Sequence, residues 1–253
     1  NYPGNPEGGS YSASELEELA AVARRFGVIL LSDEIYGQLH HQGAHVSVAR
    51  FYPEGTIVSS GLSKWCGAGG WRLGTFTFPS DLNWLMEAMA AVASETYTSV
   101  SAPIQYAAVC AFQDGSAIEY YLRHVRRILA VLGRRCTFIL QQAGVSVHAP
   151  VGAFYVFPDF SPFRAQLAQR GITNSVAFCE TLLRDTGVAV LPGTAFQRRA
   201  EELTARLAYV DFDGAKALAA SELFPLDQDL PEDFIDLWCG NVIEATQRAV
   251  EWV

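Results

Sequence analysis

The chain has 253 residues, of which 50% are hydrophobic and 18% are charged, and its formal net charge is −9. This length accommodates one large domain or two smaller ones, and the composition is typical of a globular protein rather than a disordered one. The acidic balance argues against a nucleic-acid partner, and no apolar run is long enough for a membrane span. The composition therefore predicts a folded protein that binds neither nucleic acid nor a membrane.

The cysteine pattern and the first residue give information about the cellular compartment of the protein. Five cysteines are scattered along the chain, and none forms a C-x-x-C pair. This pattern indicates a reducing compartment, hence a cytoplasmic location, and gives no support for a zinc or other metal site. Because the chain begins at Asn1 without a methionine, we expect it to be part of a longer protein whose targeting signal cannot be assessed from this sequence.

Helices and strands are predicted to alternate in the first half of the chain. Ser12 can cap a helix that continues to Arg25, with acids near its start and arginines near its end. The next segment, Val28–Leu31, is apolar on both faces, which is typical of a parallel strand buried between helices. Further strands are expected at 56–60 and 73–78, and helices at 82–93, 101–112 and 116–142.

The second half mixes shorter strands with helices. We expect strands at 152–157, 188–191 and 206–212, and helices at 175–186 and from about 231 to the end. The predicted fold class is α/β: an incomplete three-layer large domain with a mostly parallel sheet (1–115), a long interdomain helix (116–143) and a smaller α+β C-terminal domain (144–253).

A glycine-rich segment from Gly61 to Gly74 carries the most informative side chains. Its glycines disfavour regular helix and allow the backbone to approach a ligand. Lys64 and Arg72 lie eight residues apart in it, which suits a nucleophilic amine and a phosphate clamp. The alternative is a surface loop with two solvated cations.

Two further motifs precede this segment. Asp33 and Tyr36 follow directly on the strand at 28–31, where ligands of open α/β sheets bind. A carboxylate there can keep a pyridinium nitrogen protonated, although Asp33 could also simply cap a short helix. Near the start, Asn5-Pro6-Glu7-Gly8 is a typical turn, and we expect Asn5–Pro6 to be a candidate cis bond.

These motifs, in this order, resemble the class I/II aminotransferases, which are pyridoxal 5′-phosphate enzymes of fold type I. The resemblance implies that Lys64 forms the internal aldimine and is the catalytic residue, and that Arg72 binds the cofactor phosphate. It also implies that Asp33 pairs with the ring nitrogen, that Asn5 and Tyr36 contact the ring oxygen, and that Asn1 is structural. Many members carry Ser or Thr at the position of Gly61, so Ser63 or Ser60 is the expected substitute.

The resemblance extends into the second half of the chain. The segments Pro150–Tyr155 and Gly187–Phe196 look like those of the family's small domain, and Arg206 looks like the arginine that binds the substrate α-carboxylate. The resemblance therefore implies that Asn5, Asp33, Tyr36, Lys64 and Arg72 converge on one cleft, which Arg206 enters from the second domain.

The implied function is transfer of an amino group between an amino acid and a 2-oxo acid, by a homodimer. Other pyridoxal-phosphate chemistry (β-lyase, racemase or decarboxylase) remains an alternative, as does a non-catalytic effector-binding domain of a regulator. In relatives that use dicarboxylates, a second arginine lies near the segment equivalent to Ser94–Ser101, which here has none. We therefore expect a neutral or aromatic amino acid as substrate.

Overall fold

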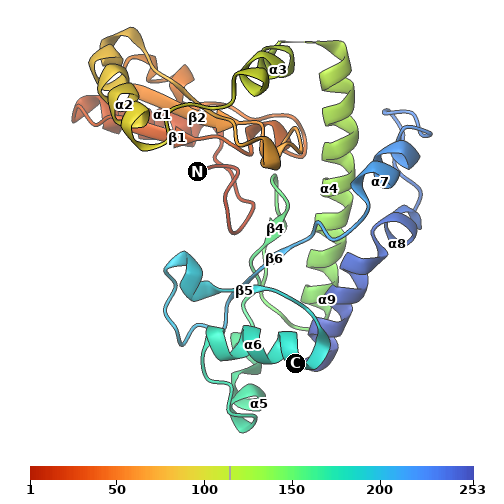
Figure 1. Ribbon diagram of the computed structural model, residues 1–253. Coiled ribbons are helices and arrows are strands. Elements are labelled where there is room, and N and C mark those ends of the chain that lie inside the picture. Colours follow the sequence, from red (N-terminus) through yellow and green to blue (C-terminus); the bar gives the residue numbers. More distant parts are fainter. Residues whose placement is uncertain (114) are drawn as a thin grey trace. The chain divides into compact units, whose positions relative to one another are not determined.

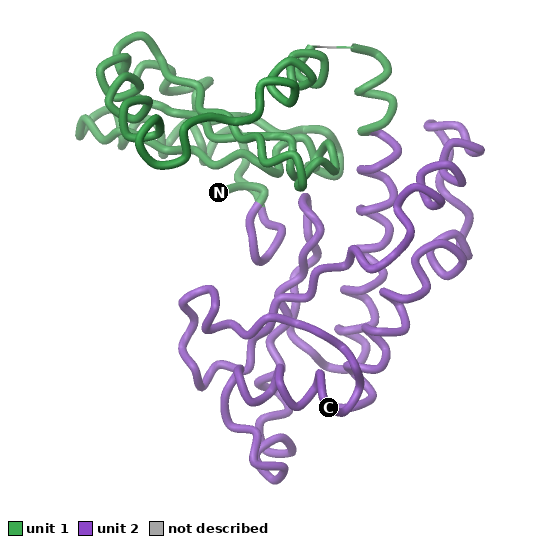
Figure 2. The backbone as a smooth tube through the Cα atoms, in the orientation of Figure 1, with its two compact units in different colours: residues 1–3, 10–122 green, residues 4–9, 123–253 purple. Residues whose placement is uncertain are grey.

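The computed structural model describes residues 1–113 and 115–253, which form two compact units (Figure 1). Unit 1 comprises Asn1–Pro3 and Ser10–Leu122, and unit 2 comprises Gly4–Gly9 and Arg123–Val253 (Figure 2). The long helix α4, Ser116–Gln142, has the predicted bounds and contributes to both units. Residues 4–9 thus group with unit 2, while the domain limits given above stay a prediction.

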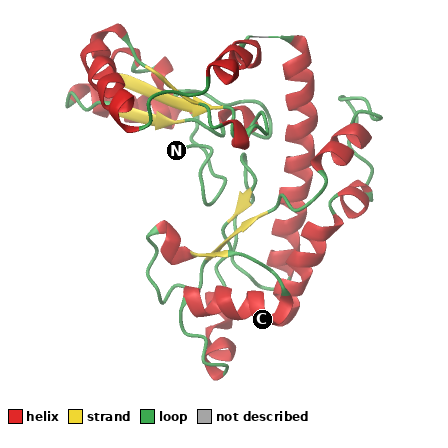
Figure 3. Cartoon of the chain, viewed as in Figure 1, coloured by secondary structure: helices red, strands yellow, loops and turns green. Residues whose placement is uncertain are grey.

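Unit 1 is built on a three-stranded sheet of β1 (Leu30–Asp33), β2 (Thr56–Gly61) and β3 (Gly74–Thr77), in that order (Figure 3). β1 pairs with β2 in parallel, whereas β2 pairs with β3 antiparallel. Of these two pairings only one is parallel. The register sets Asp33 beside Ser59 and Gly61 beside Gly74, so the carboxyl ends of β1 and β2 and the start of β3 share one edge of the sheet.

Three helices accompany this sheet: α1 (Ala13–Arg25), α2 (Asn83–Thr96) and α3 (Ala102–Phe112). The predicted cap of α1 is confirmed, because the Ser12 hydroxyl accepts from the Glu15 amide at 3.3 Å while the Ser12 amide donates to the Glu15 carboxylate at 2.8 Å. The apolar face of α1 is buried in a cluster that includes two tyrosines. Its members are Tyr2, Leu16, Ala20, Ala23, Val48 and Tyr52.

The expected burial of the first strand on both faces was wrong. The strand begins at Leu30 rather than Val28, and the Leu31 side chain is 63% exposed. Side chains alternate between the two faces of a sheet, and in the described chain Ser32 is buried on one face while Leu31 is exposed on the other. A strand is buried on both faces only where other elements cover both faces, and an apolar run of four residues does not reveal that.

Unit 2 holds a small antiparallel sheet and most of the helices in the second half of the chain. Its strands, in the order β4-β6-β5, are β4 (Tyr155–Val156), β6 (Ala205–Ala208) and β5 (Leu191–Pro192). Its helices besides α4 are α5 (Arg164–Gln169), α6 (Ser175–Thr186), α7 (Gly214–Ser221), α8 (Phe234–Trp238) and α9 (Gly240–Trp252). The prediction of α6 is confirmed, the strands are shorter than predicted, and α5 and α7 were not predicted.

The single C-terminal helix expected from about residue 231 is instead two helices. The first ends at Trp238 and the second begins at Gly240, with Cys239 between them at φ −128° and ψ 21°. Glycine is a poor helix former in an interior position, so a break beside Gly240 is physically reasonable.

A membrane span, a metal site or a disulfide would each require a particular arrangement of the described residues. In that part of the chain no helix is long and apolar enough to cross a membrane. Within the same residues, no three His, Cys, Asp or Glu side chains form a group that could hold a metal ion. All five cysteines are free thiols, and burial raises the pKa of the Cys136 thiol to about 11.

Helix α4 is joined to α7 within unit 2 by two basic side chains. Nδ1 of the fully buried His124 lies 2.8 Å from the Ser221 hydroxyl, and Nε of Arg127 donates to the same hydroxyl at 2.8 Å. The Arg127 guanidinium also donates to the carbonyls of Phe224 (2.9 Å) and Pro225 (3.0 Å), which follow the end of α7. The guanidinium also donates to the carbonyl of Ser221, the last residue of α7, so the arginine binds the end of this helix and the segment after it.

His124 should make stability depend on pH. Burial, followed by the nearby Arg127 charge, lowers the pKa of His124 from its ordinary value of 6.5. The unfolded chain then binds a proton more readily than the folded one. The contribution of His124 to the free energy of unfolding is therefore complete above about pH 6.5. We expect this contribution to be lost as the pH falls through the lowered pKa of the folded state.

Urea unfolding between about pH 8 and about pH 5 tests this expectation. His124→Asn, which keeps a polar atom near the Nδ1 position, should flatten the pH dependence, and His148→Asn, at an exposed histidine of the same unit, should not. An unchanged pH dependence in His124→Asn would contradict the assignment.

Candidate active site

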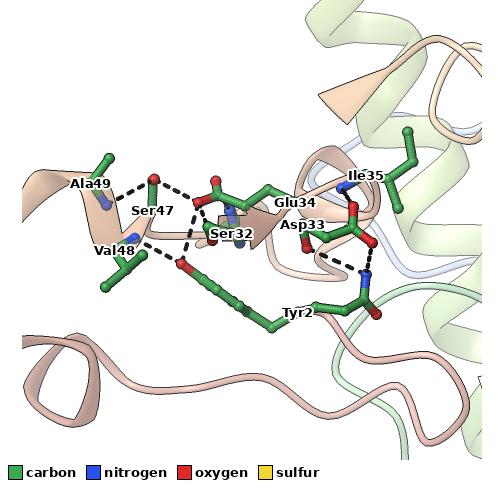
Figure 4. Close-up of polar contacts among 10 residues, drawn as sticks. Tyr2, Ser32, Asp33, Glu34, Ile35, Ser47, Val48 and Ala49 are labelled. Atoms are coloured by element: carbon green, nitrogen blue, oxygen red, sulfur yellow. Dashed lines mark hydrogen bonds and ion pairs between the residues drawn. The ribbon is translucent and has the colours of Figure 1, made fainter. Parts of the chain in front are cut away.

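The Asp33 side chain closes β1 and is held by neighbours on both of its oxygens. The Asn1 amide donates to Oδ2 at 2.7 Å, and the Ile35 backbone amide donates to Oδ1 at 3.3 Å (Figure 4). The Asp33 carbonyl accepts from the Tyr2 amide at 3.2 Å and from Asn1 at 3.3 Å. The sequence predicted only a structural role for Asn1. In the structure its side chain bonds directly to the carboxylate of Asp33, the residue expected to bind the cofactor.

Lys64 lies in the turn that directly follows β2. The Gly67 amide donates to the Lys64 carbonyl at 3.2 Å, and the Ala68 amide donates to the Leu62 carbonyl at 3.2 Å, so the turn is closed by its own backbone. Nζ of Lys64 lies 5.8 Å from the centre of the Tyr36 ring, and Tyr36 is only 3% exposed. Two residues that are 28 positions apart and were predicted for one site are thus neighbours.

Arg72 occupies the other end of the glycine-rich segment. Its φ of 56° and ψ of 42° lie in the left-handed region, which is uncommon for a residue with a side chain and is often found at functional sites. The exposed guanidinium donates from Nη1 to the Gly69 carbonyl at 2.9 Å. The Leu62 amide bonds the Leu73 carbonyl at 3.2 Å, which ties the two ends of the segment together at the sheet edge.

Gly61 has a steric reason to be glycine in this chain. A Cβ atom at this position would lie 2.7 Å from the Leu73 carbonyl oxygen and 3.0 Å from the Gly74 Cα. A serine or threonine therefore does not fit here without a backbone shift. Ser63, in the following turn, is half-buried and remains the predicted substitute for the phosphate contact, with Ser60 as the alternative.

Gly61→Ala should lower the free energy of unfolding by about 1–3 kcal/mol, because the added methyl meets backbone that cannot rotate away. Gly70→Ala is the matched control in the same segment, since nothing lies within 4 Å of a Cβ at Gly70. Urea unfolding of the two variants checks the expectation. Equal stabilities of Gly61→Ala and Gly70→Ala would show that the contact at Gly61 relaxes freely.

Arg206 and Asn5 form the second part of the candidate site, within unit 2. Nη1 of Arg206 donates to the Asn5 side-chain oxygen at 2.8 Å. The guanidinium carbon also lies 4.5 Å from the centre of the Tyr155 ring and 5.0 Å from that of Phe196. The sequence predicted a role for Arg206 but gave no signal that Asn5, 201 positions away, is its partner.

The turn that carries Asn5 is bound to unit 2 through Gly8. The Gly8 carbonyl accepts from the amides of Val151 (2.9 Å) and Gly152 (3.2 Å), and a Cβ at Gly8 would lie 2.6 Å from Cβ of Pro150. The cis bond in the described chain precedes Pro3, so the expectation for Asn5–Pro6 was wrong.

The predicted site residues fall into two sets. Asp33, Tyr36, Lys64 and Arg72 belong to unit 1, at or after the carboxyl ends of β1 and β2. Ser63 belongs to unit 1 as well, whereas Asn5 and Arg206 belong to unit 2 and are in contact. Their convergence on one cleft stays a prediction.

The chemistry of the donors in unit 1 suits a phosphorylated pyridine aldehyde. A clamped carboxylate, a primary amine beside a buried phenol and a guanidinium on a glycine-rich loop match a ring nitrogen, an aldehyde and a phosphate, respectively. The residues present therefore fit this group.

Comparison with known proteins decides the family. The family model described as "Aminotransferase class I and II" matches residues 1–214, which is most of the chain. The chain belongs to this family. The resemblance inferred from the motifs is thereby confirmed, and so is pyridoxal 5′-phosphate as the cofactor that the family uses.

Several aminotransferases are similar to the chain in sequence. An aspartate aminotransferase of Geobacillus stearothermophilus is 34% identical over 201 residues, which cover 78% of this chain and 49% of the relative. A probable N-acetyl-LL-diaminopimelate aminotransferase of Bacillus subtilis is 35% identical over 202 residues, covering 79% and 47%, respectively. The chain thus spans about half the length of the curated relatives it matches.

Solved aminotransferase structures share the fold. A double mutant of the aspartate aminotransferase of Thermus thermophilus aligns with a TM-score of 0.76 at 28% identity, over 99% of this chain and 55% of that one. The aromatic aminotransferase of Pyrococcus horikoshii also gives 0.76, at 27% identity, over 100% and 58%. The chain therefore has the fold of the matched part of these α/β aminotransferases, which is somewhat more than half of their length.

Proposed function

We propose that the protein to which this chain belongs is a pyridoxal-phosphate-dependent aminotransferase that moves an amino group between an amino acid and a 2-oxo acid. The single observation that supports this most is the joint placement of Asp33 and Lys64. Asp33 is the last residue of β1 and Lys64 lies in the turn after β2, and these two strands are parallel neighbours. Both residues therefore lie at the carboxyl ends of the strands, in a chain of the aminotransferase family.

When bound, pyridoxal 5′-phosphate supplies an aldehyde that captures an amine and a ring that accepts electrons. The Asp33 carboxylate would keep the ring nitrogen protonated, and Tyr36 would donate to the ring oxygen together with Asn5. Arg72, with Ser63, would neutralise the phosphate.

Lys64 has the central catalytic role in this proposal. Its Nζ would hold the cofactor covalently until a substrate amine replaces it. The released Nζ would then act as the base that takes the proton from the substrate α-carbon. Arg206 would orient the substrate by its α-carboxylate, which a planar guanidinium fork binds in two parallel hydrogen bonds.

The names of the relatives support transamination over the other chemistries of the same scaffold. The proteins compared above are named aminotransferases, with different substrates in their names: aspartate, N-acetyl-LL-diaminopimelate and aromatic amino acids. Screening amino-acid and 2-oxo-acid pairs with the complete protein tests the proposal. Release of pyruvate and ammonia, racemisation or loss of CO₂ in place of transamination would contradict it.

We infer that the amino donor is neutral or aromatic rather than dicarboxylic. The segment Ser94–Ser101 contains no arginine, and aromatic rings of Tyr155 and Phe196 flank Arg206. A side-chain carboxylate without a cationic partner is costly to desolvate.

This inference predicts a kcat/KM for aspartate at least about tenfold below those for leucine and phenylalanine. The comparison is made by following formation of each 2-oxo acid with one common amino acceptor. If aspartate is the best of the three donors, the inference is wrong.

The remaining proposals concern assembly, setting and the complete domain. We infer that the protein is a cytoplasmic homodimer, and that unit 1 is part of a larger three-layer domain. Several large apolar side chains of unit 1 are exposed, for example Leu31 (63%), Val92 (64%) and Tyr97 (66%). Their exposure supports the proposal that further parts of the protein or a second subunit pack against this unit. Light scattering on the complete protein measures its mass, and an active monomer would contradict the dimer.

A further inference from the structure

A buried carboxylate follows Asp33 in the sequence and is not used by the proposed chemistry. Glu34 is 8% exposed, and its Oε1 accepts from the hydroxyls of Ser47 (2.6 Å), Ser32 (2.9 Å) and Tyr2 (3.3 Å) (Figure 4). Its Oε2 lies 2.8 Å from Nε2 of His45. We call Tyr2, Ser32, Glu34, His45 and Ser47 the Glu34 cluster. Burying a charge in this way is costly unless it is fully hydrogen-bonded, as it is here.

The protonation state of Glu34 follows from these contacts. Burial alone raises the pKa of Glu34, but the hydrogen bonds from His45, Ser47 and Ser32 outweigh burial and lower the pKa below its usual range. The cluster is therefore built around a charged carboxylate.

The first connection from the cluster to Asp33 passes through Tyr2. The Tyr2 hydroxyl accepts from the Val48 amide at 2.7 Å and donates to Glu34, which fixes the buried ring at its far end. The backbone amide of Tyr2 donates to the Asp33 carbonyl. The side-chain amide of the adjacent Asn1 donates to Oδ2 of Asp33. The residue that orients the Asp33 carboxylate is therefore attached directly to a member of the cluster.

The second connection passes through the strand and the turn after it. Ser32 and Glu34 point to one face of the chain and Asp33 to the other, because side chains alternate along extended backbone. The Glu34 amide also bonds the Ser59 carbonyl at 2.8 Å. Beyond Tyr36, a Cβ at Gly37 would lie 2.8 Å from the His45 ring, so the cluster packs against that turn as well.

We propose that the Glu34 cluster is a positioning device that holds the Asp33 carboxylate in the orientation needed to bind the cofactor ring nitrogen, acting through Tyr2 and Asn1. This inference rests on the proposed function. Glu34 itself touches neither cofactor nor substrate and is a positioning residue. Its effect reaches the site through backbone and amide hydrogen bonds that set the direction of a neighbouring side chain.

The test is a double-mutant cycle with Glu34→Gln and Asn1→Ala, read out as the dissociation constant for pyridoxal 5′-phosphate in equilibrium dialysis. Glu34→Gln keeps the shape of the side chain but places an N–H₂ among donors. We expect the substitution to weaken cofactor binding by about tenfold. This is the effect of losing one good charged hydrogen bond, here the bond between a misoriented Asp33 carboxylate and the ring nitrogen. If Glu34 acts through Asn1, the double variant should bind no more weakly than the weaker single variant.

Glu54→Gln is the control, because Glu54 is an exposed carboxylate of unit 1 that pairs with Arg24 at 2.6 Å. It should bind the cofactor as the wild type does. If Glu34→Gln does not fold, Ser47→Ala removes one donor from Oε1 and enters the same cycle, with the same expectation.

Cofactor binding by Glu34→Gln equal to that of the wild type would overturn the inference. So would losses that multiply in the double variant, because they show that Glu34 and Asn1 act independently. Both results leave the proposed function intact. A wild-type protein that binds no pyridoxal 5′-phosphate would overturn the proposed function together with the inference.

Discussion

Replacing Lys64 with alanine is expected to abolish transamination, with kcat at least about 10⁴-fold below that of the wild type, because covalent attachment and the general base are lost together. The change should leave the fold intact. The Lys64 side chain does not close its turn, since the turn is held by backbone bonds from Gly67 and Ala68. Assaying purified variants with the preferred donor and acceptor measures the effect.

The sequence supplies a matched control, because Lys64 and Lys216 are its only two lysines. Lys216 lies at the start of α7, where its exposed amine pairs with Asp213 at 3.2 Å. Lys216→Ala should therefore retain full activity. A Lys64→Ala protein that keeps more than about a tenth of the wild-type rate would show that another group performs the proton transfer.

Arg206→Lys is expected to lower kcat/KM by about 100-fold, mainly through KM, because the ammonium cannot form the two parallel bonds that the guanidinium makes with a carboxylate. The substitution also removes the planar group that lies against Tyr155 and Phe196. Cofactor affinity should change little, which distinguishes lost substrate binding from a damaged site.

Arg198→Lys is the control for this second prediction. Arg198 is an exposed arginine of the same unit, paired with Glu202 at 2.7 Å, and the proposal gives it no role in catalysis. Its kcat/KM should match the wild-type value. Equal kcat/KM values for Arg206→Lys and Arg198→Lys would remove Arg206 from the substrate site.

Helices with strong local signals could be predicted from the sequence. The helices α4 and α6 have the predicted bounds, and the capping box of Ser12 and Glu15 marks the start of α1, because caps and apolar faces are encoded within a few residues. Strand limits depend instead on partners far along the chain. For that reason β1 begins two residues later than predicted, and one of its faces, with Leu31, is exposed.

The candidate site shows the same division. Asp33, Tyr36, Lys64, Arg72 and Arg206 each carry a recognisable motif, and the family assignment from those motifs is confirmed. No local pattern, however, indicates that Asn1 bonds Asp33 or that Asn5 bonds Arg206. The Glu34 cluster was missed for a related reason. Its donors come from three short segments, and a glutamate beside an aspartate gives no sequence signal of which one is buried.

Locating the covalent bond between cofactor and protein tests the central claim most directly. The complete protein is incubated with pyridoxal 5′-phosphate, reduced with borohydride and digested, and the labelled peptide is identified by mass spectrometry. We predict that the reduced cofactor is found on Lys64, in the segment between Gly61 and Gly74. A label on any other lysine of the complete protein, Lys216 included, or no labelled lysine at all, would contradict the account.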